Sequence, residues 1–253
     1  MPAEAETPTV AEPSADAHGA DLSSLVLTLI GSRHSVAPKR LQAPGPDDGQ
    51  LLQMVDAAAC APDHRGLRPW RLLRIADHQR TALADLFEAC LRDRFGPFDL
   101  PPSTDDLAKS RDKAQRAPTL LLAVLKAMPN DPEVPLTERA VTLGAALMNL
   151  LLAAHGLGFA AMLTSGRAVR SARFAQAMGL AADEQAVCFV SVGTARVGQR
   201  RARGSAADYL GDWTTGPTAA PAAPAAPAAP AAPAAPAAPD LRRAPQGSPN
   251  PGT

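Results

Sequence analysis

Two short segments of the sequence carry side chains suited to binding a ligand. The first is Arg33-His34-Ser35, which brings a guanidinium, an imidazole and a hydroxyl together shortly before Pro38. Such donors hold a phosphate group by charge-assisted hydrogen bonds. The same residues are also ordinary at the polar C-terminus of a helix, where Arg and His are common. Residue chemistry alone leaves both interpretations open.

The second segment spans residues 61–71 and reads Ala-Pro-Asp-His-Arg-Gly-Leu-Arg-Pro-Trp-Arg. It joins a predicted helix to the first predicted strand, a position where layered folds often place ligands. Gly66 would let the backbone approach a flat ring closely. We expect Asp63 to brace its own loop and Trp70 to pack in the core or in an interface. The segment therefore predicts a ligand-binding loop.

Common catalytic constellations are missing from the sequence. It contains no HExxH, GxSxG or GxxxxGK[ST] motif, and no GxGxxG follows the first predicted strand. Its histidines lack metal-ligand spacing, so no metal site is predicted. The pairs Asp47-Asp48 and Asp105-Asp106 fall at predicted helix starts, where carboxylates favour the helix dipole. Such a chain either binds a ligand or takes its chemistry from a cofactor.

Composition narrows the class of protein. The chain has 25 basic and 25 acidic side chains, so its formal net charge is zero and we expect no nucleic-acid or anionic-membrane partner. Its 3 cysteines form no CxxC pair, which fits a reducing cytoplasm. Residues 1–20 lack the basic and apolar regions of a secretory signal. Residues 141–163 are long and apolar enough to span a bilayer, but Gly156-Leu157-Gly158 interrupts them. They predict a buried helix followed by a strand.

Both ends of the chain have low sequence complexity. Residues 1–20 are rich in Ala, Pro, Glu and Asp, and residues 219–239 are seven consecutive Ala-Ala-Pro triplets. Proline at every third position disfavours helix and predicts an extended, solvated spacer. We expect a disordered N-terminal segment over 1–20, one folded domain over 21–213, and a disordered tail over 214–253.

Helix and strand signals alternate between these ends. Helices are expected over residues 21–30, 46–60, 77–94, from Ser103 onward, and over 137–155 and 169–178. Strands are expected over residues 70–76, 119–126, 159–163 and 186–194. Four strands with intervening helices indicate a layered α/β or α+β domain.

Taken in order, these motifs resemble the nitroreductase family, in its short YdjA-like branch. Arg33-His34-Ser35 is similar to the family's Arg-Arg-Ser element, and residues 61–71 to its APDH…PWR loop. Residues 113–118 resemble the K…AP entry to the second strand, and residues 155–159 the GLG turn after the central helix. The resemblance covers about 170 residues, from Leu25 to Gly193, and the joint match is stronger than any single motif.

The resemblance implies a fold and an activity. The fold would be an α+β, three-layer α-β-α domain with a central, mostly antiparallel sheet flanked by helices, in a domain-interleaved homodimer. Each of two FMN molecules would lie at the subunit interface. NAD(P)H would give a hydride to the flavin N5, and a nitroaromatic, quinone or similar flat acceptor would then bind in the same place, in ping-pong order.

The resemblance also assigns cofactor-binding residues by position. Arg33, His34 and Ser35 would bind the FMN phosphate and ribityl chain, and Thr164, Ser165 and Gly166 would close the site on the phosphate side. Cys60, Pro62 and His64 would approach the flavin from the partner subunit. Gly66 and Leu67 would lie beside the isoalloxazine. The residue types at these positions suit a dianionic phosphate and a flat ring. Because the flavin would carry out the redox chemistry, the protein needs no strong side-chain acid or base.

Three departures from the family pattern bear on this assignment. Close relatives have Arg at the position of Cys60, Trp-Arg at Leu163-Thr164, and a second Arg at His34. These changes imply weaker FMN binding, a different flavin pose, or compensation by Arg201 or Arg203. With the Ala-Pro tail, they keep open an alternative function as a degenerate, non-catalytic flavin-binding or interaction protein. A deiodinating or oxygen-using enzyme of the same superfamily is disfavoured, because residues 94–103 are too short for a lid.

Overall fold

The computed structural model describes residues 15–127, 133–195 and 203–213. The chain forms two compact units, residues 1–202 and 203–253. Most of the N-terminal segment, the Ala-Ala-Pro tail and Arg201 lie outside the described residues. In the second unit, a 3-10 turn spans Ala206–Asp208, where Asp208 Oδ2 accepts from the backbone N of Ser205 at 2.6 Å.

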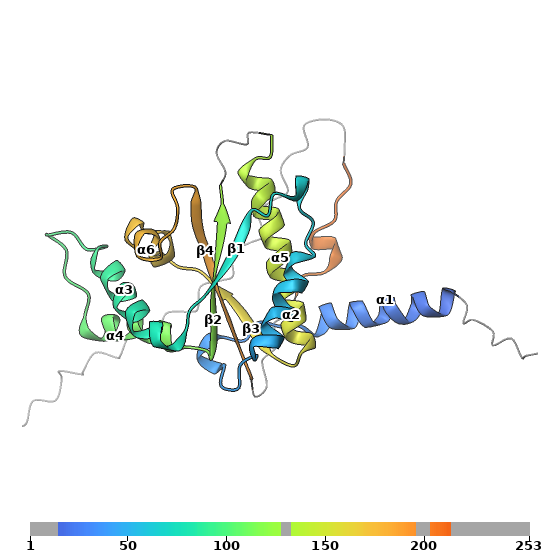
Figure 1. Ribbon diagram of the computed structural model, residues 1–253, viewed down its shortest axis with the longest axis horizontal. Coiled ribbons are helices and arrows are strands. Elements are labelled where there is room, and N and C mark those ends of the chain that lie inside the picture. The colour runs from blue at the N-terminus through green and yellow to red at the C-terminus, as the bar shows by residue number, and fades with distance from the viewer. Residues whose placement is uncertain (1–14, 128–132, 196–202, 214–253) are drawn as a thin grey trace, which may run out of the picture. The chain divides into compact units, whose positions relative to one another are not determined.

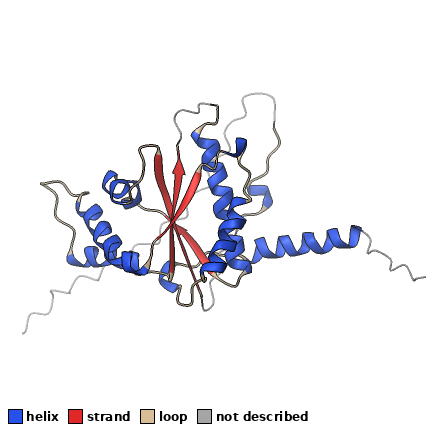
Figure 2. Ribbon diagram, in the orientation of Figure 1, coloured by secondary structure: helices blue, strands red, loops and turns tan. Residues whose placement is uncertain are grey.

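The first unit is built on a four-stranded sheet with the order β1-β2-β4-β3 (Figures 1 and 2). The strands are β1 (Trp70–Arg74), β2 (Thr119–Lys126), β3 (Ala160–Thr164) and β4 (Glu184–Gly193). The pairs β1–β2, β2–β4 and β3–β4 are all antiparallel. This confirms the expected antiparallel sheet.

Strand β2 explains why the sheet is covered on both sides. Leu121, Ala123 and Leu125 belong to one hydrophobic cluster, whereas Leu120, Leu122 and Val124 belong to another. Alternate side chains of a strand point to opposite faces. A strand that is apolar at every position therefore requires a helical layer on each face.

Helices α2 (Asp48–Ala59) and α5 (Leu136–Gly156) cover one face. Their buried side chains, among them Met54, Leu147 and Leu150, pack with Val190 of β4. The other face carries α3 (Arg80–Arg92), α4 (Thr104–Asp112) and α6 (Ala172–Ala177) (Figure 2). The predicted α-β-α sandwich is confirmed.

Polar caps set where several helices begin. Asp47 Oδ1 accepts from the backbone N of Gln50 at 2.8 Å, and Gln50 Oε1 accepts from the backbone N of Asp47 at 3.0 Å, which opens α2. Ser103 Oγ accepts from the backbone N of Asp106 at 3.1 Å and opens α4. Such caps satisfy backbone donors that have no partner inside the helix. The carboxylates at these helix starts are therefore structural.

The element boundaries depart most from the sequence expectation at three places. Helix α1 (Ala15–Ser32) begins before Asp21, within the segment expected to be disordered, where the alanines at 15, 17 and 20 favour helix. The helix expected from Asp77 opens with a 3-10 turn, and α3 starts at Arg80. The helix expected over 169–178 is a 3-10 turn followed by α6, because Ser171 caps a new helix by accepting from the backbone N of Phe174 at 3.2 Å.

Helix α5 is, within the described part of the chain, the helix that is long and apolar enough to cross a membrane by length and composition. Its residues Leu143, Leu147 and Leu150 are buried in the core cluster on the sheet. The chain then turns at Gly158, whose φ of 86° suits glycine, and enters β3. This matches the predicted buried helix followed by a strand.

The cysteines differ in exposure, which predicts their reactivity. Cys60 is exposed, Cys90 and Cys188 are buried, and all are free thiols. Burial raises the pKa of Cys188 to about 11. Because the thiolate is the reactive form, iodoacetamide at pH 8 should modify one thiol in the native protein and all of them after denaturation. Mass spectrometry would check this. A Cys60→Ser variant should lose the native labelling, and native modification of Cys188 would contradict the prediction.

Candidate functional site

The Arg33-His34-Ser35 segment lies at the edge of the sheet. Ser35 forms a parallel bridge with Ala161 of β3, and the backbone N of Val36 donates to the carbonyl of Ala161 at 3.3 Å. Helix α1 ends one residue earlier, at Ser32. The fold therefore holds this segment beside an edge strand and not simply as the frayed end of a helix.

The last turn of α5 brings His155 to the same place. Its Nε2 lies 2.8 Å from Ser32 Oγ, and His34 Nδ1 lies 3.3 Å from the Ser32 carbonyl oxygen. Desolvation lowers the pKa of His155, and its electrostatic interactions with His34 and Arg33 lower it further. Three basic groups therefore gather at one point. The sequence analysis did not include His155 among the site residues. The one sequence feature that could have indicated it is its position directly before the Gly-Leu-Gly turn.

The lowered pKa of His155 predicts a pH dependence of stability. The unfolded chain takes up a proton near pH 6.5, whereas the folded chain resists it, so the unfolded state binds more protons below that pH. The free energy of unfolding of the FMN-free protein should therefore fall as pH drops below about 6.5. Thermal melts between about pH 8 and pH 5.5 would measure it. His155→Gln should flatten the slope and the exposed-site control His78→Gln should not; an unchanged slope in His155→Gln would contradict the assignment.

Thr164, the last residue of β3, lines a cavity of about 530 Å³ together with Ser165 and Gly166, which follow it. Ser35 is paired with Ala161, and strands rise about 3.3 Å per residue, so the cavity begins roughly 10 Å further along the same strand. The structure therefore places Arg33–Ser35 and Thr164–Gly166 along one strand edge.

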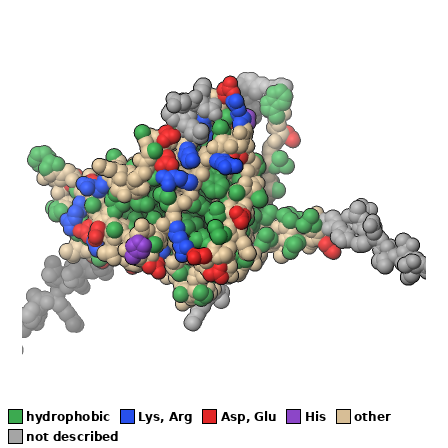
Figure 3. Space-filling view, in the orientation of Figure 1, with side chains coloured by type: hydrophobic (Ala, Val, Ile, Leu, Met, Phe, Trp, Pro, Cys, Tyr) green, Lys and Arg blue, Asp and Glu red, His purple; other side chains and the backbone are tan. Residues whose placement is uncertain are grey.

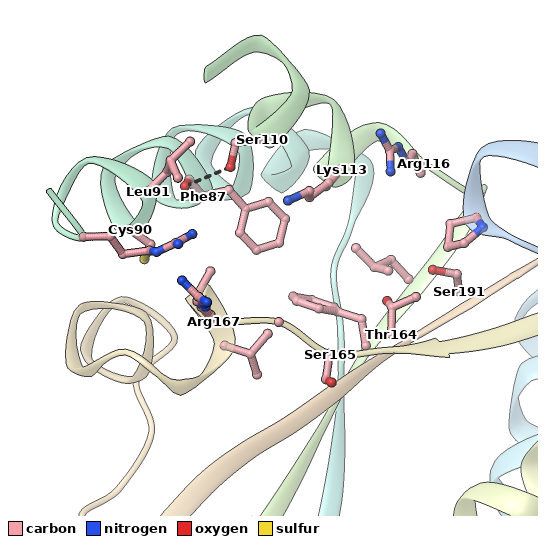
Figure 4. A pocket seen from close by; sticks show the side chains of 17 residues that line it. Phe87, Cys90, Leu91, Ser110, Lys113, Arg116, Thr164, Ser165, Arg167 and Ser191 are labelled. Atoms are coloured by element: carbon pink, nitrogen blue, oxygen red, sulfur yellow. Dashed lines mark hydrogen bonds between the residues drawn. The ribbon is translucent and has the colours of Figure 1, made fainter. Parts of the chain in front are cut away.

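The cavity has an apolar base and a cationic mouth. Phe87, Leu120 and Phe189 are buried where they line it. Lys113 and Arg167 are exposed, and Figure 4 shows both side chains directed toward the hollow around Phe87, from opposite sides. Lys113 lies in the segment that resembles the family's K…AP element, but sequence reasoning did not single it out as a site residue.

A buried arginine, Arg80, holds the segment that carries Lys113 at the side of the cavity. Arg80 Nη1 donates to the carbonyl of Ala114 at 3.0 Å, and its Nη2 donates to the carbonyl of Pro118 at 3.3 Å. These carbonyls flank the turn between η4 (Lys113–Gln115) and β2. Desolvation lowers the pKa of Arg80, a cost that these carbonyl contacts offset.

The loop after α2 is braced internally, as the sequence predicts. Asp63 Oδ2 accepts from the backbone N of Arg68 at 2.7 Å, and the Asp63 carbonyl accepts from the backbone N of Gly66 at 3.1 Å. Arg65, Gly66 and Arg68 have positive φ values of 62°, 64° and 49°. Trp70 packs against the core cluster, which confirms its packing role.

The side chains assigned to the flavin in this loop are accessible. Cys60 ends α2, and its Sγ donates to the carbonyl of Asp56 at 3.4 Å. Cys60, Pro62, His64 and Gly66 are exposed, and Leu67 is half-buried.

This loop sits at the opposite end of α5 from His155. His64 Nδ1 lies 2.9 Å from Glu138 Oε2, in the first turn of α5, and Arg65 pairs with Glu133. At about 1.5 Å per residue, Glu138 and His155 are roughly 25 Å apart along the helix. That separation exceeds the length of an FMN molecule. Within one chain, the structure therefore does not bring residues 60–67 to Arg33–Ser35.

Large apolar side chains are exposed on the helices around these segments. Leu27 on α1 is 70% exposed and Val141 on α5 is 72% exposed. Leu22, Leu25 and, on α2, Leu52 are also exposed. Both α1 and α2 contact α5, and Figure 3 shows the hydrophobic side chains along α1. Exposed apolar side chains of this size on neighbouring helices are candidates for contact with another molecule.

Comparison with known proteins identifies the family. Residues 30–194 match the family described as "Nitroreductase family". A Haemophilus influenzae protein provisionally named NAD(P)H nitroreductase is 32% identical over 168 residues, which cover 66% of this chain and 87% of that protein. The Escherichia coli protein provisionally named NAD(P)H nitroreductase YdjA is 30% identical over 170 residues, with coverage of 66% and 87%.

The fold is also shared with solved structures. A provisionally assigned nitroreductase from Desulfovibrio desulfuricans, determined in complex with FMN, superposes with a TM-score of 0.56 at 22% identity. The match covers 75% of this chain and 96% of that one. By sequence and by fold, this chain belongs to the nitroreductase family, in its short YdjA-like branch.

Proposed function

We propose that the chain is an FMN-dependent NAD(P)H oxidoreductase that reduces nitroaromatic, quinone or similar flat acceptors in ping-pong order. The observation that carries the proposal is that Arg33-His34-Ser35 lies against β3, with His155 of α5 held beside it through Ser32. The chemistry that FMN would supply when bound is to accept a hydride from NAD(P)H at N5 and then to reduce the acceptor. The residues of this chain would bind and orient the cofactor and the substrates.

The residues at the strand edge suit FMN. A dianionic phosphate needs cations and hydrogen-bond donors, which Arg33, His34 and Ser35 supply, while His155 is held beside them through Ser32. A flat ring needs open backbone beside it. A Cβ placed on Gly166 or on Gly66 would meet no heavy atom within 4 Å, so neither backbone is covered. The donor set and the open glycines together fit the cofactor.

Each segment has a definite task in this proposal. Arg33–Ser35 would bind and orient the phosphate end, and Thr164–Gly166 would fix the cofactor at the cavity wall. The buried side chains of Phe87 and Phe189 would exclude water from the bottom of the cavity. Lys113 would stabilise negative charge at the mouth.

The proposal includes a homodimer with FMN at its interface. The separation of roughly 25 Å along α5 means that residues 60–67 reach the same FMN as Arg33–Ser35 when they come from a second copy. The exposed apolar side chains of α1, α2 and α5 supply the surface for that contact. Free cysteines fit a cytoplasmic location.

The test is a flavin spectrum recorded before and after anaerobic addition of NADH or NADPH. Bound yellow flavin that bleaches, and recovers with a quinone or nitroaromatic, is the expected result. Flavin that binds but resists reduction would instead support the non-catalytic flavin-binding protein, which the neutral residues at Cys60 and Thr164 suggest. No binding at high FMN would contradict the phosphate site at Arg33–Ser35.

A further inference from the structure

The turn over residues 113–118, which leads into β2, contains a strained residue. Ala117, directly before Pro118, has a φ of 71°, a backbone conformation that residues with a Cβ rarely adopt. Strain of this kind persists only where the surrounding structure holds it in place. The contacts that hold Ala117 therefore also decide where the two sides of the 113–118 turn lie.

Close packing fixes the side of the turn that enters β2. A Cβ built on Gly193 of β4 would lie 2.7 Å from Pro118 Cδ, and a Cβ built on Gly45 would lie 3.2 Å from Pro118 Cβ. Both glycines therefore let their backbones approach the proline ring closely. Because Pro118 is wedged between them, it cannot move to relieve the backbone of Ala117.

The buried guanidinium of Arg80 binds the turn on both sides of Ala117. Its Nη1 donates to the carbonyl of Ala114 at 3.0 Å, and its Nη2 donates to the carbonyls of Ala117 and Pro118 at 3.5 Å and 3.3 Å. The Arg80 side chain is 6% exposed, and Asp77 Oδ1 lies 4.0 Å from its Nε. A planar fork of donors can bridge two positions of a turn, which the point charge of a lysine does less well.

Two parts of the proposed FMN site rest against this turn. Ala117 packs in a small buried cluster with Val36, the residue that follows Ser35. At the start of the turn, Lys113 lines the same cavity as Thr164–Gly166 (Figure 4). A displacement of the turn would therefore move the support of the phosphate segment and the Lys113 side of the cavity together.

We propose that Arg80 is a positioning residue for the FMN site, because it holds the strained 113–118 turn against both the phosphate segment and the cavity. Arg80 does not itself line the cavity, so it acts through the turn and not by contact with the cofactor. The inference rests on the proposed function for the identity of the ligand. A glycine at position 117 should make Arg80 largely dispensable, because glycine adopts a positive φ without strain.

The experiment compares the wild-type full-length chain with R80Q, A117G and R80Q/A117G. Fluorescence titration measures FMN affinity, and hydrogen–deuterium exchange of the FMN-free protein measures opening of the 113–118 turn. R80Q should raise the Kd for FMN about tenfold and speed exchange in the turn, because loss of a charged hydrogen bond populates displaced conformations. R80Q/A117G should return the Kd to within about threefold of the wild-type value and slow the exchange again.

L83A separates this effect from a general loss of stability. Leu83 is buried in α3, about one helical turn after Arg80, and does not line the cavity. L83A should lower the melting temperature, and L83A/A117G should keep whatever FMN affinity L83A has. If R80Q does not fold, R80K takes its place: its Kd for FMN should rise about threefold, and A117G should remove that rise.

Three results would overturn the inference. They are an unchanged FMN affinity in R80Q or R80K, a failure of A117G to restore that affinity, and a melting temperature of A117G well below the wild-type value, which would show that Ala117 is not strained. A failure of the proposed function looks different, because the wild-type chain would then bind no FMN. The exchange rates of R80Q and R80Q/A117G would still decide whether Arg80 holds the turn.

Discussion

Replacing Leu27 and Val141 with aspartate is expected to turn the proposed homodimer into a monomer and to release its FMN. Both side chains are large, apolar and more than two-thirds exposed, at 70% and 72%, so the change should leave the fold of one chain intact. Across a twofold interface each substitution appears twice. Unpaired buried carboxylates cost several kcal/mol each, so the dissociation constant should rise at least about a thousandfold. FMN would be lost because residues 60–67 of the second copy would no longer reach it.

Analytical ultracentrifugation at micromolar protein would measure the assembly, and absorbance of the purified protein would measure retained flavin. The matched control is F98D/L100D, which changes two apolar side chains of comparable exposure, 100% and 88%, in the connection between α3 and α4. The control should stay dimeric and yellow. A dimeric L27D/V141D protein, or equal dissociation of the control, would show that α1 and α5 do not form the interface.

Replacing Arg33 and Ser35 with alanine is expected to weaken FMN binding about a hundredfold. A guanidinium bonded to phosphate contributes about 1.5–3 kcal/mol and a hydroxyl about 1 kcal/mol, and the sum corresponds to roughly two orders of magnitude in Kd. The segment is held by backbone bonds to β3, which these substitutions retain. The loss should therefore be confined to phosphate recognition.

Riboflavin, which lacks the phosphate, separates this effect from general damage. The wild-type protein should prefer FMN over riboflavin strongly, and R33A/S35A should show little preference. Fluorescence titration of both flavins gives the ratio. R40A, which removes a nearby exposed cation, should keep the wild-type ratio. Equal loss of both flavins in R33A/S35A would contradict a phosphate-binding role.

Local features of the fold could be predicted because their causes lie within a few residues. The apolar run of β2 required burial on both faces, and the two hydrophobic clusters confirm it. The helix starts at Asp47 and Ser103 follow from side chains that bond backbone donors three residues on. Asp63 braces its own loop for the same reason. Boundaries failed where two local signals compete, as at Ser171, which ends one turn and caps the next helix.

The site was only partly predictable, since much of it depends on contacts between distant segments. Arg33-His34-Ser35 and Thr164-Ser165-Gly166 could be picked out by their motifs. His155 could not, because its role comes from the crossing of α1 and α5, which places its ring beside Ser32. Arg94, Lys113 and Arg167 come from three separate elements and share no sequence pattern.

By itself, the sequence determined the family, the alternation of helices and strands, and two candidate ligand-binding segments, because these depend on residue type and local spacing. The tertiary structure alone decided how those segments relate. The bridge between Ser35 and Ala161 puts Arg33–Ser35 on the strand that leads to Thr164–Gly166, while the length of α5 holds residues 60–67 at its far end. Strand pairing and helix length set the distances between segments that are far apart in the sequence. A local sequence pattern therefore cannot predict which segments of one chain lie in the same site.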